Sequence, residues 1–160
     1  MVTIRCETGD DVTVEGDTLV GADFSGKNLH RALLDGQVLH GVDFSEAELR
    51  SAWLEGANLD GSNLTRASLA ACNASHASFA RANLTETVMR SGVFIGADFT
   101  GATLRGAKVG RARLEGAVFK GADLRCEGLE TAALRGAVAN AETTWPDGFV
   151  PAKHGVLTES

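Results

Sequence analysis

The chain has 160 residues, a formal net charge of −6 at pH 7 and 44% hydrophobic residues. This length suits one domain, and no segment approaches the roughly 18 apolar residues in a row that a membrane-spanning helix needs. The first residues lack an apolar signal core, so we expect a cytoplasmic protein without a membrane partner. Its three cysteines (Cys6, Cys72 and Cys126) are far apart, which argues against a disulfide framework or a zinc site.

Residues 1–16 alternate apolar and polar side chains on both sides of a turn. The alternating apolar residues are Val2, Ile4 and Cys6 before the turn, and Val12 and Val14 after it. Residues 7–11 between them are rich in the small and acidic residues that favour turns. We therefore expect two short strands that cover the start of the structure that follows.

From Leu19 to Ala139, every fifth residue is apolar in one unbroken frame. These 25 centres comprise 15 Leu, six Phe, one Met, one Val and two Ala. At the overall apolar content, such a run arises by chance on the order of once in 10⁹, so an internal repeat is the first interpretation to take. The centres are expected to be buried, and the residues on either side of each centre to be exposed.

Two further columns explain the five-residue unit. The residue two positions before each centre is Ala at 16 of 25 positions, and residues two apart in an extended chain point to the same side. The residue two positions after each centre is Gly at 12 of 25 positions, as expected for a corner with positive φ. Short strands joined by regular corners coil into a solenoid. Corner residues that lie 20 positions apart form a column, and one such column lacks Gly. We expect it to turn with a different geometry. Its members are Arg31, Ser51, Ala71, Ser91, Arg111 and Thr131.

The unit resembles the motif of the pentapeptide-repeat family. Close matches are residues 22–26 (ADFSG), 57–61 (ANLDG) and 122–124 (ADL). The resemblance implies an all-β fold, a right-handed quadrilateral parallel β-helix with four units, or 20 residues, per coil. With 25 units this makes about six coils, capped at both ends.

The expected organisation is a single pentapeptide-repeat domain over residues 1–160. Residues 1–16 form the N-terminal cap, 17–141 the repeat β-helix, and 142–160 the C-terminal cap and tail. In the last segment, Trp145 and Phe149 are expected to close the end of the core as a lid.

No combination of residues in the sequence indicates catalysis. The four histidines are not at metal-ligand spacing, and the chain has no nucleophile elbow or phosphate-binding loop. An interior filled with Leu and Phe leaves no room for a ligand. We therefore expect no enzymatic activity, no cofactor and no metal.

Residues 20 apart should stack, which places an outward Trp53 next to Leu33, with Val93 and Ile95 further along the same side. We take these as candidate partner-binding residues, because Trp is enriched in interface hot spots. Asp23 and Asp43 are added as acids that steer the approach of a partner. The alternative is that Trp53 packs flat on neighbouring side chains and has a structural role only. The six candidates are Leu33, Trp53, Val93, Ile95, Asp23 and Asp43.

Charge is distributed unevenly along the chain. Residues 1–60 hold 12 acids and four bases, a net charge of −8, whereas residues 61–140 hold six acids and ten bases, a net charge of +4. The leading hypothesis is a non-enzymatic protein-interaction scaffold, whose unknown partner includes the option of a homodimer. The alternative follows from the resemblance: some pentapeptide-repeat proteins mimic DNA, bind DNA gyrase or topoisomerase IV, and protect it from inhibitors. Direct nucleic-acid binding is not expected, because no aromatic residues lie among the bases.

Overall fold

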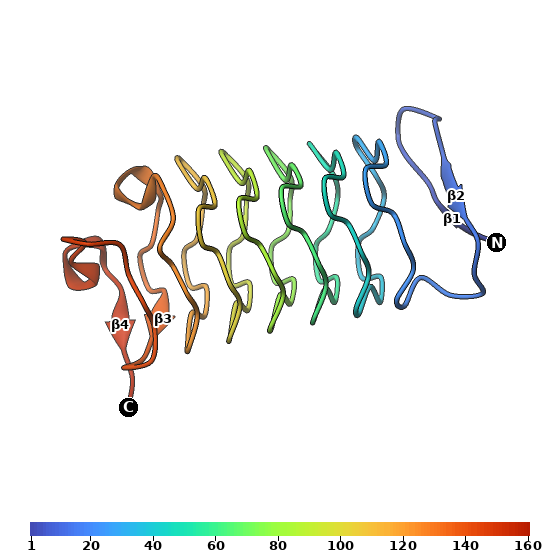
Figure 1. Cartoon of the computed structure of the whole chain (residues 1–160). Coiled ribbons are helices and arrows are strands. Elements are labelled where there is room, and N and C mark those ends of the chain that lie inside the picture. Colours follow the sequence, from blue (N-terminus) through green and yellow to red (C-terminus); the bar gives the residue numbers. More distant parts are fainter.

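The computed structural model describes residues 1–160 as a rod of stacked coils (Figure 1). Its regular elements are β1 (Val2–Ile4), β2 (Val12–Val14), η1 (Leu129–Thr131), β3 (Val138–Ala139), η2 (Pro151–His154) and β4 (Leu157–Thr158), where η marks a 3-10 helix. Between β2 and η1 the chain consists of very short extended segments joined by corners. The structure contains no helix with the length and apolarity needed to cross a membrane.

The coils stack with a register of twenty residues. Parallel bridges join Asp23 to Asp43, Asp43 to Asn63, and so on without a break as far as Val88 and Lys108. Hydrogen bonds between the backbones of neighbouring coils accompany them; the amide of Phe24, for example, donates to the carbonyl of Asp43 at 2.8 Å. Four five-residue units therefore make one coil, as the resemblance implied. The fold is a β-helix solenoid.

Every corner from Gly21 to Gly121 has the same geometry. The corner residues have φ between +55° and +70°, whether they are Gly or not. Each corner is closed by a hydrogen bond from the residue after it to the preceding centre, such as Cys72 N to Leu69 O at 3.2 Å. The expectation that the corner column without Gly turns differently is therefore wrong for its first five members. Only the last member, Thr131, departs from the common geometry, because it lies in η1. Hydrogen bonds and the inward side chains hold the non-Gly residues in a left-handed conformation that carries a steric cost.

The centres form one continuous core. All centres from Phe24 to Ala139 are buried, and only the first, Leu19, is partly exposed, because no complete coil lies outside it. The residues beside the centres are mostly half-buried rather than exposed, and Ala80 is buried. The expectation of full exposure was too simple, because neighbouring coils cover part of each outward side chain.

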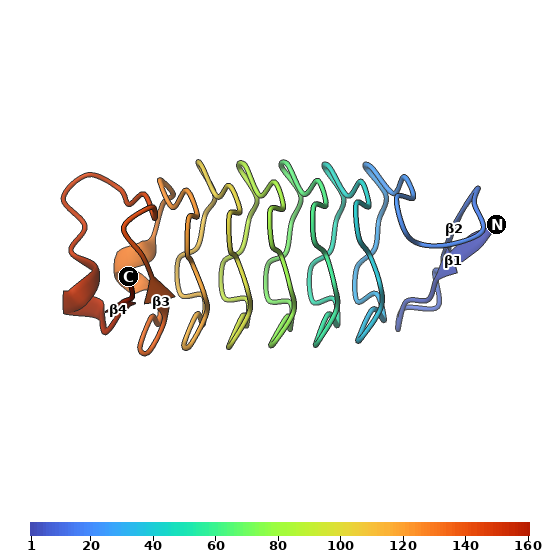
Figure 2. The same cartoon turned by 90° about the horizontal axis from the view of Figure 1, so that it is seen from below.

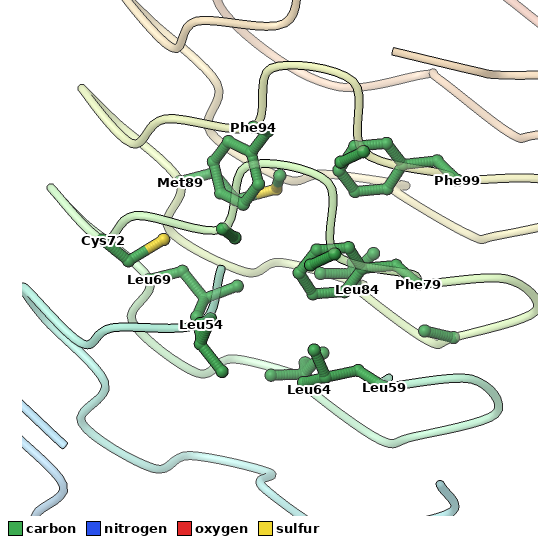
Figure 3. Close-up of a cluster of buried hydrophobic side chains, with 14 of the residues drawn as sticks. Leu54, Leu59, Leu64, Leu69, Cys72, Phe79, Leu84, Met89, Phe94 and Phe99 are labelled. Carbon is green, nitrogen blue, oxygen red and sulfur yellow. The ribbon is translucent and has the colours of Figure 1, made fainter. Parts of the chain in front are cut away.

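Large and small side chains compensate for one another inside the coils. Phe94 lies one coil beyond Ala74 in the same column, and Figure 3 shows its ring beside Met89 in the interior. The position two residues before Phe94 is Gly92, and a Cβ there would lie 2.5 Å from the Phe94 ring. Phe94 therefore uses the space that an Ala side chain fills in most other units.

The regular register slips by one residue at Cys126. Lys108 is bridged to Glu127, nineteen residues later, and the twenty-residue offset returns at Arg113 and Ala133. The slip places Cys126 in the buried small column and leaves Glu127 outward and exposed. In the strict frame the Glu127 carboxylate would point into the core without a partner, which is far more costly than a local distortion. Helix η1 restores the frame and buries Leu129.

Different structures lie at the two ends of the rod (Figures 1 and 2). The two expected short strands are β1 and β2, which pair antiparallel. The chain after β1 pairs antiparallel with the first coil through Cys6 and Ala32. At the other end β4 adds to β3 in parallel. The rings of Trp145, Phe149 and His154 stack there, with centroids 5.3 Å and 4.6 Å apart.

Candidate functional site

Leu33 and Trp53 are direct neighbours on adjacent coils. They belong to one outward ladder of parallel bridges: Leu33, Trp53, Asn73, Val93, Arg113 and Ala133. A second outward row lies on the other side of the buried centres Leu34 to Leu134, and its members are Asp35, Glu55, Ser75, Ile95, Glu115 and Arg135. We call these two rows together the interaction face.

The acidic end of the interaction face exposes large apolar surface. Leu33 is 43% exposed and Trp53 is 39% exposed, although both are large hydrophobic residues. A shallow depression of about 260 Å³ borders Trp53, and its floor includes the small side chains of Ser51 and Ala71. A second depression of about 300 Å³ lies on the other side of Leu33, next to Leu19. The two depressions beside these exposed side chains are sites into which side chains of a partner can insert.

Val93 and Ile95 lie on the same face, as expected, but they are half-buried. Asn73 separates Val93 from Trp53, and its Oδ1 accepts hydrogen bonds from the amide and the hydroxyl of Ser75 at 3.2 Å and 2.9 Å. The apolar candidates therefore form two groups on one face, with a polar pair between them.

Asp23 and Asp43 lie elsewhere. Their ladder is separated from that of Trp53 by two corners, and in a coil of four corners this places it on the opposite side of the rod. The carboxylate of Asp23 accepts bonds from the amide and the hydroxyl of Ser25 at 2.9 Å and 2.6 Å, which lower its pKa. The structure does not bring these two acids together with Trp53.

The charged residues of the interaction face were missed in the sequence, although the twenty-residue spacing contains the signal. Asp35 and Glu55 flank the apolar pair, whereas Arg113 and Arg135 lie at the far end of the same face. Arg113 Nε donates to Glu115 Oε1 at 3.3 Å, and Arg135 takes part in no ion pair. The face thus carries Asp35 and Glu55 at one end, and Arg113, Glu115 and Arg135 at the other.

Two cysteines and two histidines of the chain are buried or engaged in contacts. Burial raises the pKa of the Cys72 thiol, and it raises that of Cys126 to about 12, so both thiols stay protonated. His30 Nδ1 donates to the carbonyl of Arg50 at 2.9 Å, and His154 stacks on Phe149. No cluster of His, Cys, Asp or Glu is placed to hold a metal ion. What the surface of this molecule presents to a partner is its shape, its apolar side chains and its charges.

Comparisons with known proteins agree with this architecture. The solved structure of a pentapeptide repeat protein from the thylakoid lumen of Arabidopsis thaliana is 30% identical, with a TM-score of 0.60 over 61% of this chain and 68% of that chain. A pentapeptide repeat protein from Nostoc is 24% identical, with a TM-score of 0.54 over 73% of this chain and 84% of that one. QnrB1, a plasmid-mediated fluoroquinolone resistance protein, is 17% identical over 88% of this chain and 89% of that one, with a TM-score of only 0.33. No curated protein sequence matches the chain significantly.

A family model described as pentapeptide repeats (8 copies) matches residues 19–61, 62–101 and 97–126, which is more than half of the chain. The match ends at Cys126, where the register slips. The unit that follows departs from the motif, because it has Glu127 at the position where most units have Ala. On the matched residues and the β-helix that they form, the chain belongs to the pentapeptide repeat family.

Proposed function

We propose that this protein is a non-enzymatic interaction scaffold and that it docks a protein partner on the interaction face. The observation that carries the proposal is the exposure of Leu33 and Trp53, side by side on adjacent coils. Their positions are fixed by backbone hydrogen bonds within and between the coils, such as Leu34 N to Trp53 O at 2.8 Å. A preorganised aromatic side chain loses little conformational entropy on binding, which favours its use as an anchor.

The experiment places a photo-crosslinking amino acid at position 53 and, as the control, at position 38. Val38 is 55% exposed but lies outside the interaction face, so it matches Trp53 in accessibility. We expect a crosslinked protein from position 53 only, and we expect Trp53→Ala to weaken the association while the melting temperature stays nearly unchanged. A large loss of stability in Trp53→Ala with unchanged association would show that the indole is structural.

We further propose that residues 1–160 form one right-handed domain of about six coils with closed ends, in which 1–16 and 142–160 flank the repeat region 17–141. The ring stack of Trp145 and Phe149 supports a lid at the C-terminal end. Deleting residues 142–160 should expose the last coil and cause aggregation. A truncated protein that remained monomeric and equally stable would contradict this assignment.

Mimicry of DNA toward gyrase or topoisomerase IV is the second candidate. The supporting observation is that Asp23 and Asp43 carry carboxylates on adjacent coils of one ladder. The next residues of this ladder are not acidic: they are Asn63, Asn83 and Thr103. The last residue, Asp123, is an acid, but it is paired with two arginines. A supercoiling assay with purified gyrase and an inhibitor tests this candidate. Protection that disappears in Asp23→Asn/Asp43→Asn would favour mimicry over the scaffold.

A further inference from the structure

The interaction face is electrostatically complementary to itself when one copy is reversed. Its second outward row begins with Asp35 and Glu55 and ends with Glu115 and Arg135. Its first row carries Trp53 near the start and, near the end, Arg113, which pairs with Glu115. Each row has six positions. Reversing a second copy therefore brings the acidic end of one rod onto the basic end of the other.

We propose that the interaction face binds a second copy of this chain, antiparallel, around a two-fold axis between the levels of Asn73 and Val93. This inference rests on the proposed function and names the partner. This axis lies between the two facing copies and is parallel to their strands. Rotation about it sets each row of one copy opposite the same row of the second copy, with the coils in reverse order. The opposed pairs, each joining one copy to the second copy, are Asp35 with Arg135, Trp53 with Arg113, Leu33 with Ala133, Asn73 with Val93, and Ser75 with Ile95.

The side chains that form these pairs are free to contact a second copy. Asp35 uses one carboxylate oxygen to accept from the amide of Glu55 at 2.8 Å, which leaves its second oxygen for a guanidinium. Arg135 is exposed and makes no ion pair within the chain. Arg113 is exposed, and its planar guanidinium can stack on the indole of Trp53. The small Ala133 leaves room for the protruding Leu33 side chain.

Charge also disfavours two other alignments. Rods aligned in parallel would oppose the acidic first 60 residues, net charge −8, to themselves. Moving the axis by half a coil toward the N-terminus would bring Asp35 opposite Glu115. In the proposed alignment Glu55 faces Glu115, but Arg113 lies beside Glu115 and offsets that contact. A standard interface takes roughly 800 Å² from each partner, a small part of the 7491 Å² that this protein exposes, and the interaction face extends over six coils.

The test is a charge swap read by analytical ultracentrifugation of the full chain over a range of concentrations. Asp35→Arg and Arg135→Asp should each raise the dimer dissociation constant about tenfold or more, because each opposes like charges twice in the dimer. The double variant D35R/R135D restores opposite charges and should return the constant to within about threefold of the unmodified protein. Trp53→Ala should raise it about tenfold, and Val38→Ala should leave it unchanged.

Several outcomes would overturn the inference. These are a monomer at every concentration, a double variant no better than the single ones, or a dimer that is insensitive to Trp53→Ala. The double variant Glu55→Arg/Arg135→Glu could restore the dimer dissociation constant where the Asp35 double variant does not. That result would place the axis half a coil away and overturn the alignment. A monomer that still crosslinks a different protein from position 53 would leave the proposed scaffold function intact. The absence of any crosslink at position 53 would instead contradict the proposed function itself.

Discussion

Phe79 and Phe99 stack on adjacent coils, with ring centroids 5.0 Å apart and planes 4° from parallel. Phe119 continues the column, with its centroid 5.3 Å from that of Phe99. All three rings are fully buried. Because three successive coils each contribute one ring to this column, removing the middle ring disturbs the contacts of two neighbouring coils.

Phe99 is therefore the position at which we expect the core to be most sensitive. Phe99→Ala should lower the free energy of unfolding by about 3–5 kcal/mol, because it leaves a cavity between two rings. Phe99→Leu keeps most of the volume and should cost less than about 1.5 kcal/mol. Phe99→Asp should prevent folding, since its carboxylate would be buried without a partner. Chemical denaturation followed by circular dichroism measures all three, and equal costs for Ala and Leu would contradict the cavity argument.

The corners provide a matched pair of opposite substitutions. Ala71 has φ of +55°, whereas Gly56 has φ of +66° with no atom within 4 Å of the position of an added Cβ. Ala71→Gly should raise the free energy of unfolding by roughly 0.5–1 kcal/mol, and Gly56→Ala should lower it by a similar amount, because only Gly adopts this conformation without a steric cost. Thermal denaturation of both variants checks the signs. Changes of the same sign would show that corner strain does not control stability here.

Two hydroxyl groups occupy the small inward column in place of Ala. Thr87 Oγ1 donates to the carbonyl of Leu64 at 2.7 Å, whereas the buried Ser62 Oγ has no hydrogen-bond partner. Ser62→Ala should stabilise the protein by about 1 kcal/mol, because it removes a buried polar atom that gains nothing in the fold. Thr87→Ala should destabilise it by about 1–2 kcal/mol, because it removes a satisfied hydrogen bond and a methyl group. Urea denaturation distinguishes the two, and a destabilised Ser62→Ala would indicate that Ser62 has a partner.

The pH dependence of stability should report on Asp123. Hydrogen bonds from the side chain of Arg125, together with Arg105, hold the pKa of this carboxyl well below its usual range. A carboxyl with a lowered pKa in the folded state stabilises the fold above its unfolded pKa, and this contribution is lost as the pH falls below about 4. Asp123→Asn should therefore be less stable than the unmodified protein at pH 7, and the difference should shrink at pH 2.5. A difference that is independent of pH would contradict the ion-pair explanation.

The interaction face could be predicted only in part. The twenty-residue spacing correctly placed Leu33, Trp53, Val93 and Ile95 on one side, because outward residues of a regular coil repeat with the period of the chain. Grouping Asp23 and Asp43 with them ignored the two intervening corners. The role proposed here for Asp35 and Arg135 required the arrangement of the complete face, since each of these residues taken alone is an ordinary exposed charge.

The sequence by itself determined the repeat, the buried columns and the family, because burial of one large and one small side chain every five residues leaves a periodic record in the chain. Only the tertiary structure decided that the corners from Gly21 to Gly121 turn alike, with or without Gly, because hydrogen bonds to the next coil impose φ on residues such as Arg31 and Ala71. It also decided that the register slips at Cys126. The cost of burying the Glu127 carboxylate there exceeds the cost of distorting one corner, and this balance depends on the packing of neighbouring coils.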